Sequence, residues 1–211
     1  MDKYIPAEET RCDIRVLNSR FIGVLAPAFS VQEAREFIQG IKKEFPDATH
    51  HIPLYLIGHG ASVTAHCSDD GEPSGTAGRP ALTVLQGSGL GDVVGVVIRY
   101  FGGTKLGTGG LVRAYGDTVK AVLETLPRAK KVATHTAMVV APYNLFERLR
   151  LLIKEHKGIT FDEEFGADVT ITARFAQTDF PLFQKALQEM SNGTVEAEII
   201  ESDEDTILPI L

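Results

Sequence analysis

A glycine-rich segment at residues 100–116, YFGGTKLGTGGLVRAYG, is one of two places in this sequence where residue types and spacing could support chemistry. It stands between a run of β-branched residues and an amphipathic run, so we expect a junction of a strand and a helix. Such a junction leaves backbone N–H groups free at the positive end of the helix dipole, where an anion can bind. The segment therefore predicts an anion-binding loop made of Arg99, Gly102, Gly103, Thr104, Lys105, Gly107, Thr108, Gly109, Gly110 and Arg113.

The charge of this loop contrasts with that of the whole chain. No carboxylate occurs from Val93 to Gly116, although the chain has 28 Asp and Glu against 21 Lys and Arg. A locally positive loop in an acidic protein favours a phosphate of RNA or of a small ligand. An alternative stays open, in which the glycines supply only positive φ angles and close helix packing.

Two nucleotide motifs do not fit the loop. No Gly-Lys-Ser/Thr sequence closes a P-loop, and Val112 stands where a dinucleotide fold requires its third glycine. Nucleotide hydrolysis and hydride transfer therefore lose support, and we expect no cofactor.

The acidic loop SDDGEPSGTAG, residues 68–78, is the second candidate site. We expect its carboxylates to accept N–H bonds in tight turns around Gly71 and Gly75, and Ser74 or Thr76 to cap the next helix. A binding role is added to this structural one. The motif consists of Asp69, Asp70, Glu72, Ser74, Thr76 and Arg79.

Three catalytic interpretations of the acidic loop compete with the structural one. A divalent metal could bind the carboxylates, but their spacing is not that of an EF-hand and no histidine pair has zinc-protease spacing. A nucleophile at Cys67 needs an adjacent base, but His66 would point to the opposite face of a strand. Asp69 and Asp70 likewise point apart in an extended chain, which weakens a carboxylate pair. We expect no catalytic residue and no metal, and a metal-assisted hydrolase or peptidase that uses Asp69, Asp70 and Glu72 remains the alternative.

Length and composition limit the class of protein. At 211 residues the chain is long enough for two domains that each bury a core. No segment approaches the roughly 18 apolar residues that span a bilayer, and the first residues lack the features of a secretion signal, so we expect a cytoplasmic protein. Cys12 and Cys67 are too few for a disulfide framework and are expected to stay reduced.

Periodicity and turn signals predict the elements of residues 1–127. A capping box at Ser30 and Glu33 marks the start of the most regular helix. Pro53 indicates an edge or strand-start position at its own place. The segment DVVGVVIRYF, residues 92–101, is apolar on both faces, as in an interior strand. The remaining elements are hairpins within residues 10–28 and 52–67 and helices at residues 79–87 and 110–126.

The second half of the chain has its own pattern. Pro127 ends a helix, and the following RAKK, residues 128–131, is expected to be a linker, so we place domains at residues 1–127 and 128–211. Beyond it the order β, α, β, β, α, β is that of a ferredoxin-like sandwich, an open sheet with both helices on one face. The end, ESDEDTILPIL, opens acidic and closes apolar, and is expected to be a tail whose last residues dock.

The two loops together resemble the signature of a known family. DDGEPSGTAGRP, followed by VVIRYFGGTKLGTGGLVRAY, is similar to the motif pair of the YigZ/IMPACT family, and SRFIG at residues 19–23 matches its opening strand. The resemblance implies an α+β fold with an N-terminal α/β sandwich like ribosomal proteins and elongation-factor domain IV. It also implies a C-terminal ferredoxin-like domain similar to elongation-factor domain V.

The resemblance also implies a function in translation. Eukaryotic members restrain a starvation-responsive initiation-factor kinase by competing for its activator, but this chain lacks their extra N-terminal interaction domain, so that role does not transfer. We expect a non-catalytic regulator that binds RNA, the ribosome or a translation-related protein, with a phosphate-like anion in the glycine loop and no membrane contact. A pure protein-interaction module is a third interpretation, and it predicts an exposed apolar patch.

Overall fold

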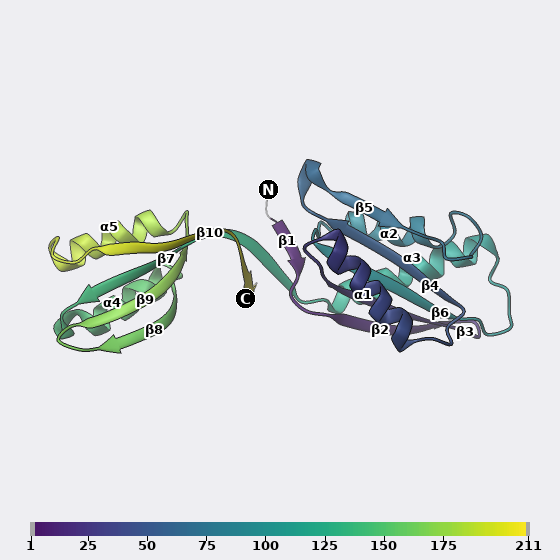
Figure 1. Cartoon of the computed structure of the whole chain (residues 1–211), viewed down its shortest axis with the longest axis horizontal. Helices are drawn as coiled ribbons and strands as arrows, with labels where there is room; N and C mark the ends of the chain where they lie inside the picture. The colour runs from purple at the N-terminus through teal and green to yellow at the C-terminus, as the bar shows by residue number, and fades with distance from the viewer. Residues whose placement is uncertain (1–2, 210–211) are drawn as a thin grey trace. The chain divides into compact units, whose positions relative to one another are not determined.

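The computed structural model describes residues 3–209, which form two compact units. One unit runs to Lys130 and the other covers Lys131–Leu208 (Figure 1). Within the described residues there are five α-helices and two five-stranded sheets, so the chain is of the predicted α+β class. No helix in this part of the chain is long and apolar enough to cross a lipid bilayer. The predicted domain boundary, after residue 127, lies close to the division, and independent folding of each unit stays a prediction.

The sheet of the N-terminal unit has the order β2-β3-β6-β4-β5, and all its pairings are antiparallel. The strand β6, which was predicted to be interior, lies between β3 and β4 and is buried along nearly its whole length. The bounds of the strands are Thr10–Val16 (β2), Ser19–Pro27 (β3), His50–Ile57 (β4), Thr64–Cys67 (β5) and Val93–Tyr100 (β6).

Helices cover both faces of this sheet (Figure 1). The helix α1, Val31–Glu44, packs its buried side chains on one face, against a cluster that includes Val24 and Val96. The helices α2, Gly78–Gly87, and α3, Gly107–Thr125, pack on the other face. The loops that lead into α2 and α3 are therefore held at the same face of the sheet.

The start of α1 follows the predicted capping pattern. Ser30 is the N-cap, and its hydroxyl accepts a hydrogen bond of 3.1 Å from the Glu33 N–H. The Glu33 carboxylate accepts from the N–H of Phe29, one residue before the cap, at 2.9 Å. The predicted box is thus present, with its second bond shifted by one residue.

Pro53 lies in the interior strand β4, yet it disrupts no ladder bond. The neighbouring strand β5 ends at Cys67, opposite Leu54, and the Pro53 carbonyl accepts from the Ser68 N–H at 3.3 Å. Because the N and C=O of one strand residue point to the same side, the missing N–H of Pro53 faces the place where β5 has already ended. Pro53 therefore lies at an edge position, as predicted, because β4 has no neighbouring strand on that side at this residue, although β4 is an interior strand further along.

The C-terminal unit has the predicted element order. The helices α4, Phe146–Glu155, and α5, Phe180–Ser191, share one hydrophobic cluster with one face of the sheet, which includes Val139, Ile171 and Phe175. Its strands follow the order β10-β7-β9-β8. Their bounds are Arg128–Ala141 (β7), Ile159–Phe165 (β8), Val169–Ala176 (β9) and Ala197–Pro209 (β10), and a short 3-10 turn at Tyr143–Leu145 precedes α4.

Four sequence-based expectations need correction. The segment RAKK is not an irregular linker, because β7 begins at Arg128. Residues 201–209 are not a tail but continue β10, whereas docking of residues 210 and 211 lies outside the described residues. The helix α3 begins at Gly107, three residues earlier than expected. The strand β1, Lys3–Pro6, was not predicted, and it pairs with β7.

Candidate functional site

The acidic loop and the glycine loop meet at one cleft of the N-terminal unit. The cleft has a volume of about 370 Å³. It takes residues from the acidic loop, from the end of β6 with the loop after it, and from the first turns of α3. Its lining residues are Glu72, Pro73, Arg99, Phe101, Lys105, Leu106, Gly107, Thr108 and Leu111.

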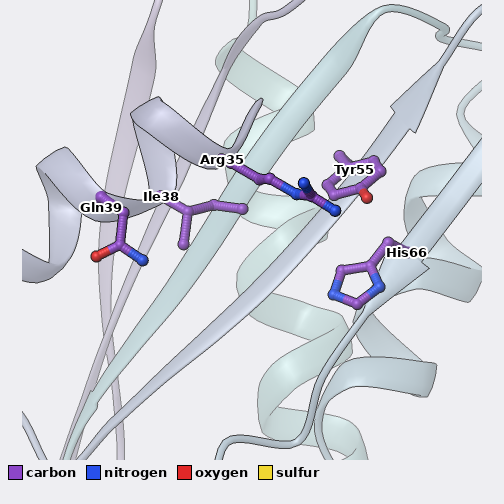
Figure 2. A pocket seen from close by; sticks show the side chains of 5 residues that line it. All are labelled: Arg35, Ile38, Gln39, Tyr55 and His66. Atoms are coloured by element: carbon purple, nitrogen blue, oxygen red, sulfur yellow. The ribbon is translucent and has the colours of Figure 1, made fainter. Parts of the chain in front are cut away.

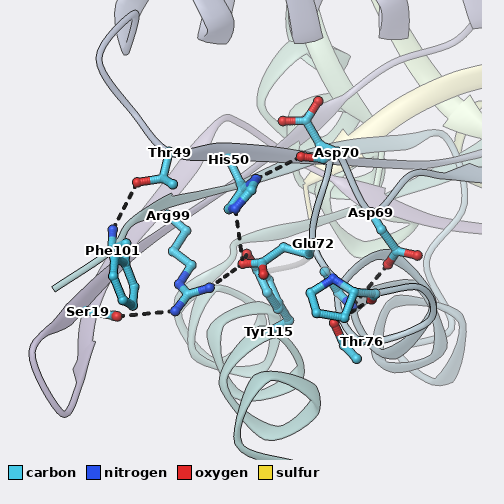
Figure 3. Close-up of polar contacts among 12 residues, drawn as sticks. Ser19, Thr49, His50, Asp69, Asp70, Glu72, Thr76, Arg99, Phe101 and Tyr115 are labelled. Carbon is cyan, nitrogen blue, oxygen red and sulfur yellow. Dashed lines mark hydrogen bonds and ion pairs between the residues drawn. The ribbon is translucent and has the colours of Figure 1, made fainter. Parts of the chain in front are cut away.

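A buried ion pair forms one wall of the cleft (Figure 3). Arg99 donates from Nη1 to the Glu72 carboxylate, and only 6% and 4% of the two side chains are exposed. Tyr115 of α3 donates its hydroxyl to the same carboxylate oxygen at 2.6 Å. Burial, and then the bond to Glu72, raises the pKa of Tyr115 far above its ordinary value, so this hydroxyl stays protonated and donates.

The guanidinium of Arg99 is incompletely satisfied. Its Nη2 lies 3.4 Å from the Ser19 hydroxyl, and its Nε–H, which is buried, has no hydrogen-bond partner among the described residues. Its central carbon lies 5.5 Å from the centre of the Phe101 ring. Because the carboxylate of Glu72 neutralises its charge, Arg99 adds no net positive charge to the site, and its buried Nε–H remains an unsatisfied donor.

Asp69 organises the entry to α2 (Figure 3). Its carboxylate accepts from the N–H of Gly75 at 2.7 Å, of Gly78 at 2.8 Å and of Ala77 at 3.1 Å. Burial would raise the pKa of Asp69, but these three bonds outweigh it and hold the pKa below its ordinary value. The expectation that Ser74 or Thr76 caps α2 is therefore wrong, because Asp69 takes that role from outside the helix.

The other residues of the acidic loop have separate partners. Asp70, whose φ of 43° lies in the left-handed region, accepts from the His51 N–H at 2.7 Å and from Lys42 Nζ at 3.4 Å. Its carbonyl lies 2.8 Å from His50 Nδ1. Thr76 donates its hydroxyl to the Pro73 carbonyl at 2.7 Å, which closes the turn before α2. The exposed side chains of Ser74 and Arg79 lie outside the cleft lining.

These partners leave the metal alternative without support. Asp69 is bound by backbone N–H groups, Asp70 by an N–H and a lysine, and Glu72 by an arginine and a tyrosine. The described residues contain no group of three or more His, Cys, Asp or Glu that could hold a metal ion. The three carboxylates do not converge on a common point where hydrolysis could occur.

The side chains of His66 and Cys67 lie on opposite faces of the sheet, as expected for neighbours on a strand. Cys67 packs against the cluster shared with α2 and α3, and burial raises the pKa of its thiol. His66 stacks on Tyr55 at 5.1 Å on the other face. There the two rings line a small pocket of about 200 Å³ beside Arg35, Ile38 and Gln39 of α1 (Figure 2). No nucleophile and base pair results.

The glycine loop between β6 and α3 is held against other turns. A Cβ at Gly102 would lie 1.9 Å from the Asn18 carbonyl oxygen, so no other residue fits there. Asn18 also donates from Nδ2 to the Thr104 hydroxyl at 3.2 Å. The Phe101 N–H donates to the Thr49 hydroxyl at 3.0 Å. Part of the glycine content thus has a structural cause, as the alternative interpretation held.

The backbone N–H groups at the start of α3 have no capping side chain. The N-cap of α3 is Leu106, and the first turn of the helix, which holds Thr108, Gly109 and Gly110, has no acidic residue. The exposed Lys105 has no ion pair among residues 3–209. Such a helix start, beside a lysine, presents N–H donors and positive charge to the cleft.

Two glycines of the loop have backbone angles that favour glycine, and one predicted member of the loop lies outside the cleft lining. Gly103 and Gly107 adopt φ angles of 84° and 72°, which favour glycine. The exposed Arg113 lies beyond the first turn of α3 and is not among the residues that line the cleft.

Sequence reasoning did not assign four of the lining residues to the site, Pro73, Phe101, Leu106 and Leu111, nor the buried Tyr115 that bonds to Glu72. Tyr115 was assigned to the apolar stripe of α3, and its bond to Glu72 gave no sequence signal. Phe101 was assigned to the end of β6, although an aromatic residue directly before two glycines is a signal that could have indicated an exposed ring.

Comparison with known proteins gives consistent matches over nearly the whole chain. Residues 17–123 match the Impact N-terminal domain, and residues 139–194 match a domain of unknown function, DUF1949. IMPACT family member YigZ of Escherichia coli is 34% identical over 93% of this chain and 97% of its own length. IMPACT family member YvyE of Bacillus subtilis is 36% identical over 86% of this chain and 83% of its own.

A solved structure described as that of a hypothetical protein has a TM-score of 0.62 and 34% identity, over 95% of this chain and 98% of that one. These matches, together with the paired loops at the cleft, show that the chain belongs to the IMPACT family.

Proposed function

We propose that this protein is a non-catalytic regulator of translation that binds RNA of the translation apparatus through the cleft between the two loops. The observation that carries the proposal is the uncapped start of α3, which lies beside the unpaired Lys105 in the same cleft. Membership of the IMPACT family supports the link with translation, because the resemblance implies it.

A phosphate is the chemical group that suits this cleft. Backbone N–H groups in the first turn of α3 can donate to its oxygens, and Lys105 supplies a charge that no described carboxylate neutralises. The neighbouring Arg99 and Glu72 match each other in charge, so the net charge of the lining residues is positive. An anion therefore gains from entering the cleft, even though the whole chain has a net charge of −7.

The finer description of the fold is part of the proposal. The order β10-β7-β9-β8, with both helices on one face, supports a ferredoxin-like C-terminal unit of the elongation-factor domain V type. The N-terminal unit has helices on both faces of its sheet, and we propose that it is of the elongation-factor domain IV type. We also propose that the two units fold independently and that the protein acts in the cytoplasm.

Ribosome co-sedimentation tests the proposed function. The protein should sediment with ribosomes from its own cells at low salt, and Lys105→Glu should weaken the association and reduce its salt slope by about one charge. Lys120→Glu is the matched control, because Lys120 is an exposed lysine of α3 that pairs with Asp117 and does not line the cleft. If Lys105→Glu and Lys120→Glu bind equally well at every salt concentration, the cleft does not bind the ribosome.

A further inference from the structure

Phe101 places an exposed aromatic ring in the cleft lining. Its side chain is the first after β6, and 46% of the residue's surface is exposed. The residue is nevertheless fixed, because its N–H donates to Thr49 and its ring lies beside the Arg99 guanidinium (Figure 3). A ring that is both exposed and anchored can stack on a flat ligand with little loss of side-chain entropy.

The remaining walls of the cleft combine two kinds of surface. Pro73, Leu106 and Leu111 are apolar, whereas Lys105 and the first turn of α3 attract an anion. A second observation points to a ligand here. Arg99, which is 5% exposed, lines the cleft and has an Nε–H without a partner among the described residues. The ligand that suits this surface has an anionic group joined to a flat, largely apolar group.

We propose that the cleft binds one unpaired nucleotide of an RNA strand, with its phosphate at Lys105 and the start of α3 and its base stacked on Phe101. This inference rests on the proposed function and adds that the RNA is single-stranded at the contact. Ligand pockets range over about 300–1,000 Å³, so the 370 Å³ of the cleft suits a single nucleotide. In a duplex both faces of each base are already stacked, so Phe101 has no free base to contact.

Binding of short oligomers to the full-length protein tests this inference. The probes are fluorescently labelled oligouridine, an abasic ribose–phosphate oligomer of equal length, and an RNA duplex. Oligouridine should bind on the order of tenfold more tightly than the abasic oligomer, which is the size of effect expected from one stacked base. Phe101→Ala should remove this difference, and Phe101→Tyr should keep it. Lys105→Glu should weaken binding of both oligomers to a similar degree.

Two outcomes separate this inference from the proposed function. If the abasic oligomer or the duplex binds the parent protein as tightly as oligouridine, and Lys105→Glu still weakens binding, base stacking is overturned while phosphate binding stands. If neither oligomer responds to Lys105→Glu, both proposals are overturned, and a protein partner becomes the better hypothesis. The comparison of the three probes on the parent protein does not depend on whether any variant folds. Thermal unfolding of each variant checks that the variant is folded.

Discussion

The two units of this chain use charged side chains in opposite ways. Residues 1–130 contain 14 basic and 14 acidic residues, whereas residues 131–211 contain 7 and 14, so the net charge of −7 arises in the second segment. In the N-terminal unit a buried Arg99–Glu72 pair lines the cleft. In the C-terminal unit carboxylates such as Glu164 and Glu198 lie exposed on β8 and β10, the outer strands of its sheet.

This difference separates two physical tasks. Buried charged side chains fix the shape of a cleft and the positions of its hydrogen-bond donors, because a buried ion pair has few alternative geometries. Charges on outer strands discourage pairing with another strand, and acidic ones also repel RNA. The comparison therefore favours the N-terminal unit as the place of the proposed RNA contact.

The largest expected effect comes from breaking the buried pair. Glu72→Ala leaves Arg99 charged and buried without its carboxylate, which should lower the free energy of unfolding by about 3–5 kcal/mol. The matched variant in the other unit is Glu163→Ala, since Glu163 pairs with Arg150 at 3.2 Å on the surface. That change should cost about 1 kcal/mol or less. Urea unfolding measures both values, and similar losses would remove the proposed contrast between the units.

Asp69→Asn should have the next largest effect. Asp69 accepts three backbone N–H bonds at the entry to α2, so its loss should cost about 1–2 kcal/mol near neutral pH. Since folding lowers the pKa of Asp69, its contribution is present above the unfolded pKa of about 3.9 and is lost as the pH falls through the folded pKa. The difference in stability between parent and variant should therefore shrink as the pH falls below about 4. Thermal unfolding across a pH series checks this, and a difference that is constant with pH would contradict it.

Much of the fold was predictable because its signals are local. The helix α1 has a cap and a regular apolar stripe, and β6 is apolar on both faces, so each could be read from adjacent residues. The strand β1 was missed because four residues that include Pro6 give almost no periodicity. The segment RAKK predicts a linker because basic residues at the start of β7 resemble a loop in sequence.

The site was only partly predictable, because local signals reveal each loop but not the contacts between distant parts of the chain. Both loops were found from their composition, but their meeting depends on the packing of α3 and β6, which lie far along the chain from the acidic loop. A cap is normally sought next to its helix, whereas Asp69 lies eight residues before Ala77. Nothing local indicates that Glu72 is buried, because its partners Arg99 and Tyr115 come from other elements.

A smaller effect, of opposite sign, is expected from Gly109→Ala. A Cβ at Gly109 would meet nothing within 4 Å, and its φ is not positive, so the described structure does not require glycine there. Alanine should raise the stability of the first turn of α3 by about 0.5–1 kcal/mol. If RNA approaches this backbone closely, the same variant should bind RNA more weakly. A variant that gains both stability and affinity would contradict a close backbone contact at Gly109.

The smallest expected effect tests whether the acidic unit opposes RNA. The variant Glu164→Gln and Glu198→Gln removes two exposed charges, one on each outer strand, and should strengthen binding of oligouridine on the order of twofold at low salt. The effect is small because charges that interact through water contribute at most about 1 kcal/mol, and it should vanish in high salt as screening increases. The matched control is the variant Glu36→Gln and Glu124→Gln, which removes two exposed carboxylates on α1 and α3, away from the cleft lining. An increase in affinity that persists at high salt would mean that RNA contacts these strands directly, and the assignment of RNA contact to the N-terminal unit alone would then be wrong.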